Sequence, residues 1–170
     1  FKDLGFVHTS MEPVVSSDEN PYAIKEEDLP KILAEYEKLA TFYADVKAKD
    51  DPFSFFHFTV DLSQGPCVIK RISGCGAGTE YLCVTPEGDL YPCHQFVGDE
   101  AYKMGNLLEA DLTLPKDMQT KFQEAHIYNK EDCKTCFSKF YCSGGCHANA
   151  LSFNQDILKP YKIGCEMQKK

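Results

Sequence analysis

The sequence has no long apolar run and no excess of positive charge. No stretch approaches 18 consecutive apolar residues, so no segment is expected to span a membrane. Its 18 basic against 26 acidic residues give a net charge of −8, the wrong sign for a surface that binds nucleic acid or anionic lipid through phosphates. With 43% hydrophobic and 26% charged residues, a disordered, collagenous or coiled-coil chain is excluded. A length of 170 residues predicts one globular domain or slightly more.

Cysteine is absent from residues 1–66, whereas the rest of the chain is rich in it. The nine cysteines are Cys67, Cys75, Cys83, Cys93, Cys133, Cys136, Cys142, Cys146 and Cys165. Because nine is odd, a pure disulfide framework would leave one thiol over. Nothing near Phe1 resembles the apolar region of a signal peptide. Metal ligation by thiolates in a reducing compartment, the cytoplasm, is therefore favoured over a disulfide scaffold.

The half without cysteine predicts one strand followed by one helix. Residues 4–15 are rich in β-branched and aromatic types and predict a buried strand. Apolar residues at spacings of three and four predict an amphipathic helix over about residues 28–49, with Asp28 as its cap and Pro30 in its first turn. Residues 53–62 fit either a helix or a buried strand. One strand and one helix cannot cover their own apolar faces, and the chain opens at Phe1, so we expect a piece of a larger protein.

The cysteine-rich half begins after Gly65 and Pro66 and predicts a hairpin and two helices. Residues 79–85 and 89–91 flank a turn with Gly88, where a positive φ is usually needed. Helices are expected over residues 115–125 and near residues 145–151.

Four closely spaced cysteines carry the strongest signal. They are Cys133, Cys136, Cys142 and Cys146, separated by two, five and three residues. Such spacing lets one loop and the start of one helix present several sulfurs to one point, as a soft metal or an iron–sulfur cluster requires. The Ser143-Gly144-Gly145 insert allows a tight bend beside a large inorganic group. Zinc held by four cysteines remains equally compatible with this segment taken alone.

The full cysteine pattern resembles the SPASM domain of radical S-adenosylmethionine enzymes. That pattern has seven cysteines, with a glycine before the second, and the resemblance covers about residues 67–170. Here the elements are Cys75, Gly88, Cys93, Cys133, Cys136, Cys142, Cys146 and Cys165. The resemblance implies an α+β fold in which residues 65–170 form the SPASM domain. Residues 1–64 would be the last strand and helix of a partial (β/α)6 barrel plus a linker.

The same resemblance implies two auxiliary [4Fe-4S] clusters with interleaved ligands. The first would be held by Cys75, Cys93 and Cys146, with Cys67 as a possible fourth ligand or an iron left open for substrate. The second would be held by Cys133, Cys136, Cys142 and Cys165. Cys83 lies outside the pattern and is expected to be a small buried apolar residue.

A finer resemblance is to the maturases of six-cysteine-in-forty-five-residue (SCIFF) peptides. It rests on the strings at residues 65–71, 74–78, 84–98 and 104–106. Such enzymes are similar to sactipeptide maturases and install thioether cross-links from cysteine sulfurs in a cysteine-rich precursor peptide, which would be the partner here. S-adenosylmethionine and a third [4Fe-4S] cluster would belong to the full-length enzyme only. The radical-generating Cys-x3-Cys-x2-Cys signature is absent, since Asn149 stands at the last required place after Cys142 and Cys146.

Two other functions remain open, and several side chains have alternative roles. A sulfatase-maturing enzyme is disfavoured because His94 stands where those relatives carry an aspartate base after the cysteine. A zinc-stabilised protein-binding module is the other alternative, with zinc in place of the clusters. His94 and His147 are expected to pack beside ligands, with a base at His94 as the alternative, and His8, His57 and His126 to be structural or exposed. Lys70 and Arg71 could contact peptide carboxylates, and Met11 could line the barrel mouth or pack in the core.

Overall fold

The computed structural model describes residues 1–17, 19–59 and 72–169, in two compact units. Unit 1 comprises Phe1–Pro66 and Glu166–Lys170, and unit 2 comprises Cys67–Cys165. Cys67, Lys70, Arg71 and the expected boundary between residues 64 and 65 lie outside the described residues. Within the described residues, no helix is both long and apolar enough to cross a membrane.

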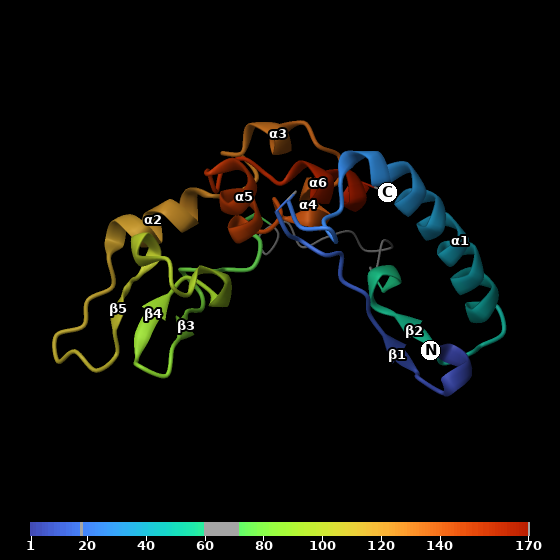
Figure 1. The fold of residues 1–170 in the computed structure, drawn as a ribbon, viewed down its shortest axis with the longest axis horizontal. Helices are drawn as coiled ribbons and strands as arrows, with labels where there is room; N and C mark the ends of the chain where they lie inside the picture. The colour runs from blue at the N-terminus through green and yellow to red at the C-terminus, as the bar shows by residue number, and fades with distance from the viewer. Residues whose placement is uncertain (18, 60–71, 170) are drawn as a thin grey trace. The chain divides into compact units, whose positions relative to one another are not determined.

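Unit 1 is a small β-α-β arrangement, drawn from dark blue to teal in Figure 1. Strand β1 (His8–Thr9) pairs in parallel with β2 (Ser54–Phe55), and α1 (Leu29–Lys47) lies between them in the chain. Short 3₁₀ helices occupy Lys2–Leu4, Glu26–Asp28 and Phe56–Phe58. The core consists of Val46, Phe53 and Phe55, against which Leu39, Tyr43 and Phe58 pack.

The predicted helix is confirmed, but its predicted cap is wrong. Asp28 occupies the cap position without capping α1. Its carboxylate accepts instead from the backbone N–H of Lys25 at 3.0 Å, which stabilises the preceding 3₁₀ turn. Pro30 lies in the first turn of α1, where its missing N–H costs no hydrogen bond.

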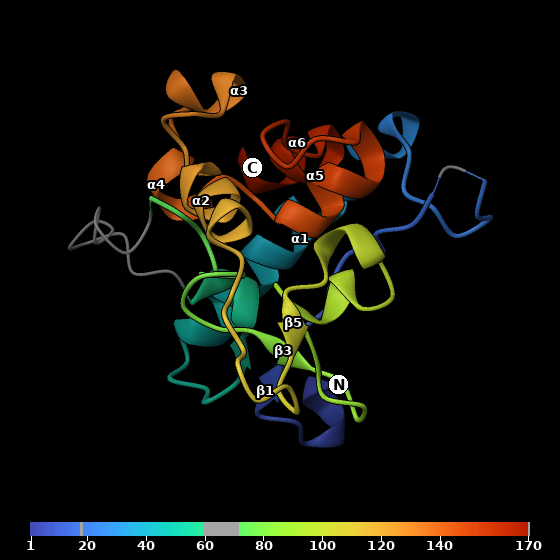
Figure 2. The same ribbon diagram turned by 90° about the vertical axis from the view of Figure 1, so that its left-hand side faces the viewer.

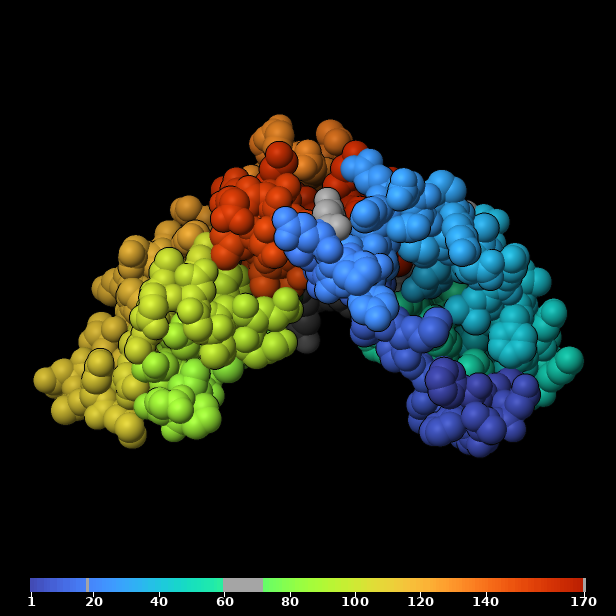
Figure 3. Space-filling view, viewed as in Figure 1, coloured from blue at the N-terminus to red at the C-terminus, as the bar shows by residue number. Residues whose placement is uncertain are grey.

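The prediction that residues 4–15 form a buried strand is wrong. Only two of these residues are in a strand, and apolar neighbours such as Leu4 (77% exposed) and Phe6 (54% exposed) face outward. Among the described residues β1 has one neighbouring strand, so the sheet is too small to bury the whole segment. Figure 3 shows the first residues, in dark blue, on the surface. Of the unassigned residues 53–62, the first seven contain both β2 and a 3₁₀ turn, which fits the mixed pattern there, and residues 60–62 lie outside the described residues.

Unit 2 contains an antiparallel sheet of three short strands. Strands β3 (Cys83–Val84), β4 (Asp89–Tyr91) and β5 (Gly105–Asn106) lie in that order. Gly88 has φ 87° at the turn between β3 and β4, as the hairpin required. The first hairpin strand is shorter than expected, because residues 77–81 form a tight turn with a single β-bridge.

The remaining helices of unit 2 are short. They are α2 (Lys116–Glu124), α3 (Glu131–Lys134), α4 (Lys139–Cys142), α5 (His147–Asn154) and the first residues of α6 (Lys162–Lys169). Both predicted helices are therefore confirmed, although the second extends to Asn154. Figures 1 and 2 show α3, α4 and α5 at one end of unit 2 and the sheet at the other. Helices and small sheets together make the α+β fold that was expected.

The core of unit 2 joins the sheet to α2 and to the chain near α5. Its buried members are Ala77, Tyr91, Cys93, Phe96, Tyr102 and Phe122. The ring of Phe122 packs edge-on against Phe96 and His147, with centroids 5.5 Å away in both pairs. This core therefore reaches the segments that carry the patterned cysteines.

Candidate metal centre

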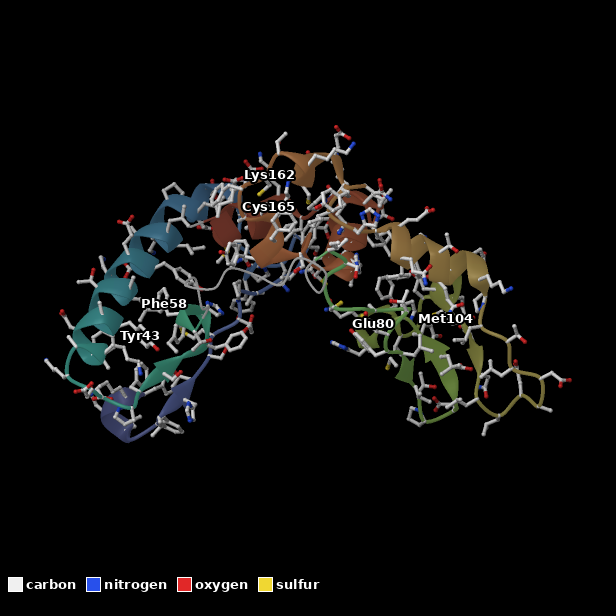
Figure 4. All side chains as sticks on the ribbon, turned by 180° about the vertical axis from the view of Figure 1, so that it is seen from behind. Tyr43, Phe58, Glu80, Met104, Lys162 and Cys165 are labelled. Atoms are coloured by element: carbon white, nitrogen blue, oxygen red, sulfur yellow. The ribbon has the colours of Figure 1, made fainter. Side chains whose placement is uncertain are left out.

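Cys75 lies in a tight turn between two glycines. Gly74 and Gly76 have φ values of 72° and 75°, which a side chain rarely adopts. A Cβ at Gly74 would lie 3.2 Å from the backbone oxygen of Ser143, so this turn closely approaches the one that separates Cys142 and Cys146. Gly76 lies against Glu80, labelled in Figure 4, and a Cβ there would be 2.7 Å from the Glu80 Cβ.

Cys93 is buried two residues after the end of β4. The N–H of Gly78 donates to the backbone oxygen of Pro92 at 3.0 Å, which joins the Cys75 loop to the residue before Cys93. A Cβ at Gly78 would lie 2.9 Å from the Phe122 ring, so only glycine allows this approach.

Cys146 is half-buried at the start of α5. The side-chain amide of Gln95, two residues after Cys93, donates to the Cys146 sulfur at 3.7 Å. Hydrogen bonds to sulfur are one means by which a protein adjusts the potential of a cluster.

Electrostatic contacts join Cys75, Cys93 and Cys146 into one group, here called the first set. Burial raises the pKa of the Cys93 thiol, and the negative charges of Cys146 and Cys75 raise it further. Burial, with the charges of all three cysteines and a hydrogen bond with Cys75, raises the pKa of Tyr81 to about 12. Charge interactions thus link the three residues expected to hold the first cluster with one another and with the phenol of Tyr81.

The second set consists of Cys133, Cys136, Cys142 and Cys165. Cys133 is buried in α3, and its backbone oxygen accepts from the N–H of Cys136 at 3.1 Å. The Cys136 sulfur lies 3.4 Å from the hydroxyl of Ser138. Cys142 ends α4, and Cys165 lies near the start of α6, where Figure 4 labels it with Lys162.

Three consecutive left-handed residues turn the chain between Cys142 and Cys146. Ser143, Gly144 and Gly145 have φ values of 62°, 88° and 73°. The tight bend inferred from the Ser-Gly-Gly insert is therefore confirmed. It returns the chain within three residues, so one cysteine from each set flanks a single turn.

Charges also connect the members of the second set. Burial raises the pKa of the Cys133 thiol, against the attraction of Lys130, and the charges of Cys142 and Cys136 add to the rise. Lys130 in turn interacts with Cys133, Cys142, Cys146 and Cys165. Every expected ligand of the second cluster thus interacts with either Cys133 or Lys130.

In neither set do the cysteine side chains that the structure describes point to one common metal position. Within residues 1–17, 19–59 and 72–169, no three histidine, cysteine or acidic side chains are placed to hold a metal ion. The eight cysteines described form no disulfide. Thiolates repel one another, so final convergence of such ligands commonly accompanies metal binding.

The residues between the cysteines fit a cluster. Soft thiolates are the donors that iron–sulfur clusters use. The Ser143 hydroxyl is buried, lacks a hydrogen-bond partner in the described structure, and lies between Cys142 and Cys146. A buried hydroxyl without a partner is costly, and a sulfide of a bound cluster would accept its hydrogen bond.

The histidines differ from one another more than the sequence suggested. His147 is buried beside Cys146, as expected, and burial lowers its pKa to about 4, helped by the charge of Lys130. His94 is exposed, so the expected packing of its side chain is wrong, because the 3₁₀ turn after Cys93 buries Phe96 instead. His8 is exposed, and the Nδ1 of His57 shares a hydrogen bond of 2.9 Å with the Tyr36 hydroxyl.

Other side chains singled out from the sequence fall into place as follows. Cys83 is half-buried in β3 and packs against the unit 2 core. His126 is half-buried, and its Nδ1 accepts from the Tyr128 N–H at 3.2 Å. Met11 lines a cavity of about 380 Å³ in unit 1, together with the loop at residues 21–24 and one face of α1.

Sequence reasoning missed Lys130 and Tyr81. Neither belongs to the cysteine pattern, and lysine is ordinarily exposed, whereas Lys130 is fully buried. Only the folded chain reveals that both lie among the cysteines.

Comparison with known families agrees with this arrangement. Residues 75–137 match the SPASM family model, described as an iron-sulfur cluster-binding domain. No curated protein matches the chain. The matched segment includes Cys75, Cys93, Cys133 and Cys136 and ends before Cys142. This similarity supports iron–sulfur cluster binding by the cysteine-rich part of the chain, in a protein associated with radical S-adenosylmethionine chemistry.

Proposed function

We propose that the cysteine-rich part is the auxiliary-cluster and substrate-positioning module of a radical S-adenosylmethionine peptide maturase. Cys75, Cys93 and Cys146 would hold a first [4Fe-4S] cluster, with Cys67 or substrate completing it. Cys133, Cys136, Cys142 and Cys165 would hold a second. The full enzyme would install cysteine thioether cross-links in a ribosomally made, cysteine-rich peptide, as the SCIFF maturases do.

One observation supports the proposal: charge interactions link cysteines within each of the two sets that the SPASM pattern implies. Cys93 interacts with Cys75 and Cys146 from distant parts of the sequence. Cys133 interacts with Cys136 and Cys142, and Lys130 interacts with Cys133 and Cys165. Cys146 adjoins the second set in sequence, yet Gln95 donates to its sulfur and its negative charge acts on Cys93 of the first set. A zinc site built from the four neighbouring cysteines alone gives no reason for this interleaving.

The exposure of Cys75 supports a role in substrate contact. Cys75 is exposed, whereas Cys93 is buried and Cys146 half-buried. Bound clusters would supply one-electron transfer and, at an open iron, a site that binds a substrate thiolate. The chain itself would hold the thiolates, bury one face of the first set and leave the other open to a peptide.

Unit 1 would supply the end of the partial barrel. Its parallel strands and intervening helix are compatible with one β-α-β repeat of such a barrel. The cavity beside Met11 would then lie within that part of the enzyme.

Anaerobic reconstitution tests the proposal. The chain is incubated with iron and sulfide, desalted, and analysed for iron, acid-labile sulfide and zinc alongside its visible spectrum. Two clusters require about eight irons and eight sulfides per chain and a broad band near 400 nm. Zinc bound at four thiolates each, with no iron after reconstitution, would contradict the proposal and favour a zinc-stabilised binding module.

Peptide binding tests the substrate class. A synthetic peptide with several cysteines should change the electron paramagnetic resonance signal of the reduced first cluster, whereas the same peptide with serine at each cysteine should not. Equal effects of the two peptides would contradict thiolate capture at the first set.

A further inference from the structure

Lys130 is buried completely among the predicted cluster ligands. Its side chain is 0% exposed, and its Nζ donates to the backbone oxygen of Gly144 at 2.8 Å. Lysine is almost never fully buried unless its charge is compensated. The charge of Lys130 therefore needs an explanation from its surroundings.

No carboxylate supplies that compensation in the part of the chain that the structure describes. None of the ion pairs found there includes Lys130. Burial lowers the pKa of Lys130, and the negative charges of four cysteines of the two sets raise it: Cys133, Cys142, Cys146 and Cys165. These cysteines become anionic when they bind metal, so a bound cluster would place negative charge beside Lys130.

Lys130 also connects two segments that carry ligands. Its backbone oxygen accepts from the N–H of Cys133 at 2.9 Å, which starts α3. Its side chain holds the carbonyl of Gly144, in the turn between Cys142 and Cys146. Gly144 leaves room for this contact, since a Cβ there would lie 3.4 Å from the Lys130 Nζ.

We propose that Lys130 is a positioning residue that fixes the Gly144 turn and raises the reduction potential of the cluster held by Cys133, Cys136, Cys142 and Cys165. This inference rests on the proposed function. A fixed positive charge stabilises the reduced, more negative state of a nearby cluster over the oxidised state. Since Lys130 also interacts with Cys146 of the first set, the same charge would act more weakly on the first cluster.

The test compares Lys130→Met, Lys130→Arg and Lys134→Met in the whole, anaerobically reconstituted chain. Lys134 is a matched control, because it also lies beside Cys133 but its side chain is 47% exposed and paired with Glu131. Redox titration followed by electron paramagnetic resonance gives each cluster potential, and iron analysis gives the loading.

We expect Lys130→Met to lower the reduced-to-oxidised ratio of the second cluster about tenfold at a fixed potential, which is about 59 mV for one electron. Lys130→Arg and Lys134→Met should stay close to the wild type. A Lys130→Met potential indistinguishable from that of Lys134→Met would overturn the inference.

If Lys130→Met binds no cluster, its potential cannot be measured, and the iron content of Lys130→Arg becomes the test. Retention of iron by Lys130→Arg would then support a requirement for the positive charge. Equal loss in both variants would overturn the inference, because the packing of the lysine chain rather than its charge would be essential. A wild-type chain that binds no iron overturns the proposed function as well, whereas unchanged potentials in a loaded Lys130→Met overturn the role of Lys130 alone.

Discussion

The two units bury different kinds of side chain. Unit 1 closes on apolar residues alone, with Val46, Phe53 and Phe55 at its centre. In the described residues, every buried polar or charged side chain belongs to unit 2: Lys130, Ser138, Ser143 and His147. All four lie in the segment that also contains Cys133, Cys136, Cys142 and Cys146. Among the residues that the structure describes, polar side chains are thus buried near the cysteines, as expected for a site rather than an apolar core.

The units also differ in how their elements can be stable. Unit 1 has a helix of 19 residues and aromatic pairs such as Tyr43 with Phe58, whose centroids lie 5.4 Å apart. In unit 2, α3 and α4 have four residues each. Helices so short are not stable alone, so their stability must come from what surrounds them. Under the proposed function, bound clusters supply part of that stability.

Removal of the iron should produce the largest difference in stability between the two units. A chelator under reducing conditions should destabilise unit 2 by several kcal/mol, because metal binding contributes directly to folding. Hydrogen exchange measured by mass spectrometry should show lost protection across α3, α4 and α5, with α1 little changed. Equal loss in α1 and α3, or none in either, would contradict the distinction between the units.

Deleting one buried ring from each unit should separate stability from iron binding. Phe122→Ala and Phe53→Ala each remove a buried ring and should cost about 3–5 kcal/mol of unfolding free energy in urea titrations. Phe122 packs against His147, beside Cys146, so its loss should also lower the iron content. Phe53→Ala should leave the iron content unchanged, and a comparable loss of iron in both variants would refute this contrast.

Two glycines with nearly equal φ provide a smaller test within unit 2. Gly144 and Gly98 have φ values of 88° and 89°, but a Cβ would meet Ile127 and Lys130 only at Gly144. Gly98→Ala should cost about 1 kcal/mol from its backbone conformation. Gly144→Ala should cost about 1 kcal/mol more, because it displaces neighbours in a packed site. Equal unfolding free energies for the two variants would show that the Gly144 turn is not tightly packed.

The smallest expected effect concerns pH at the sheet. Hydrogen bonds from Lys103 and Asn106 hold the pKa of Asp89 below its ordinary value of 3.8. This stabilisation is therefore present above pH 3.8 and is lost as the pH falls through the lowered pKa of the folded state. Carboxyl chemical shifts followed by nuclear magnetic resonance should show the Asp89 pKa rising in Lys103→Met. The neighbouring Glu87→Gln should leave it unchanged, and an unmoved pKa in Lys103→Met would contradict this assignment.

The sequence predicted local structure best where one residue type decides the geometry. Gly88 at the hairpin turn and Pro30 in the first turn of α1 are examples, since each restricts φ or removes a donor. The prediction of a buried strand over residues 4–15 was wrong because burial of a strand depends on neighbouring strands, and apolar content alone does not show whether they are present. The prediction that Asp28 caps α1 was wrong because its carboxylate accepts a hydrogen bond from the backbone N–H of Lys25 instead.

The site was predictable in its cysteines but not in its surroundings. Metal ligands must be soft donors at close spacing, so the pattern from Cys133 to Cys146 is visible in the sequence. The approach of Gly74 to Ser143 joins residues far apart in the chain and depends on tertiary packing. Lys130 was missed for the same reason, because burial of a lysine follows from the whole fold.

Counting iron in ligand variants tests the central claim, two separate sets of cysteines, most directly. Cys93→Ala and Cys133→Ala should each lose about half of the iron of the reconstituted wild-type chain, and the double variant nearly all of it. Cys83→Ala is the matched control, since Cys83 is a half-buried thiol of unit 2 outside both sets, and it should lose none. Complete loss in either single variant with full retention in the other, or a loss in Cys83→Ala equal to theirs, would contradict the assignment.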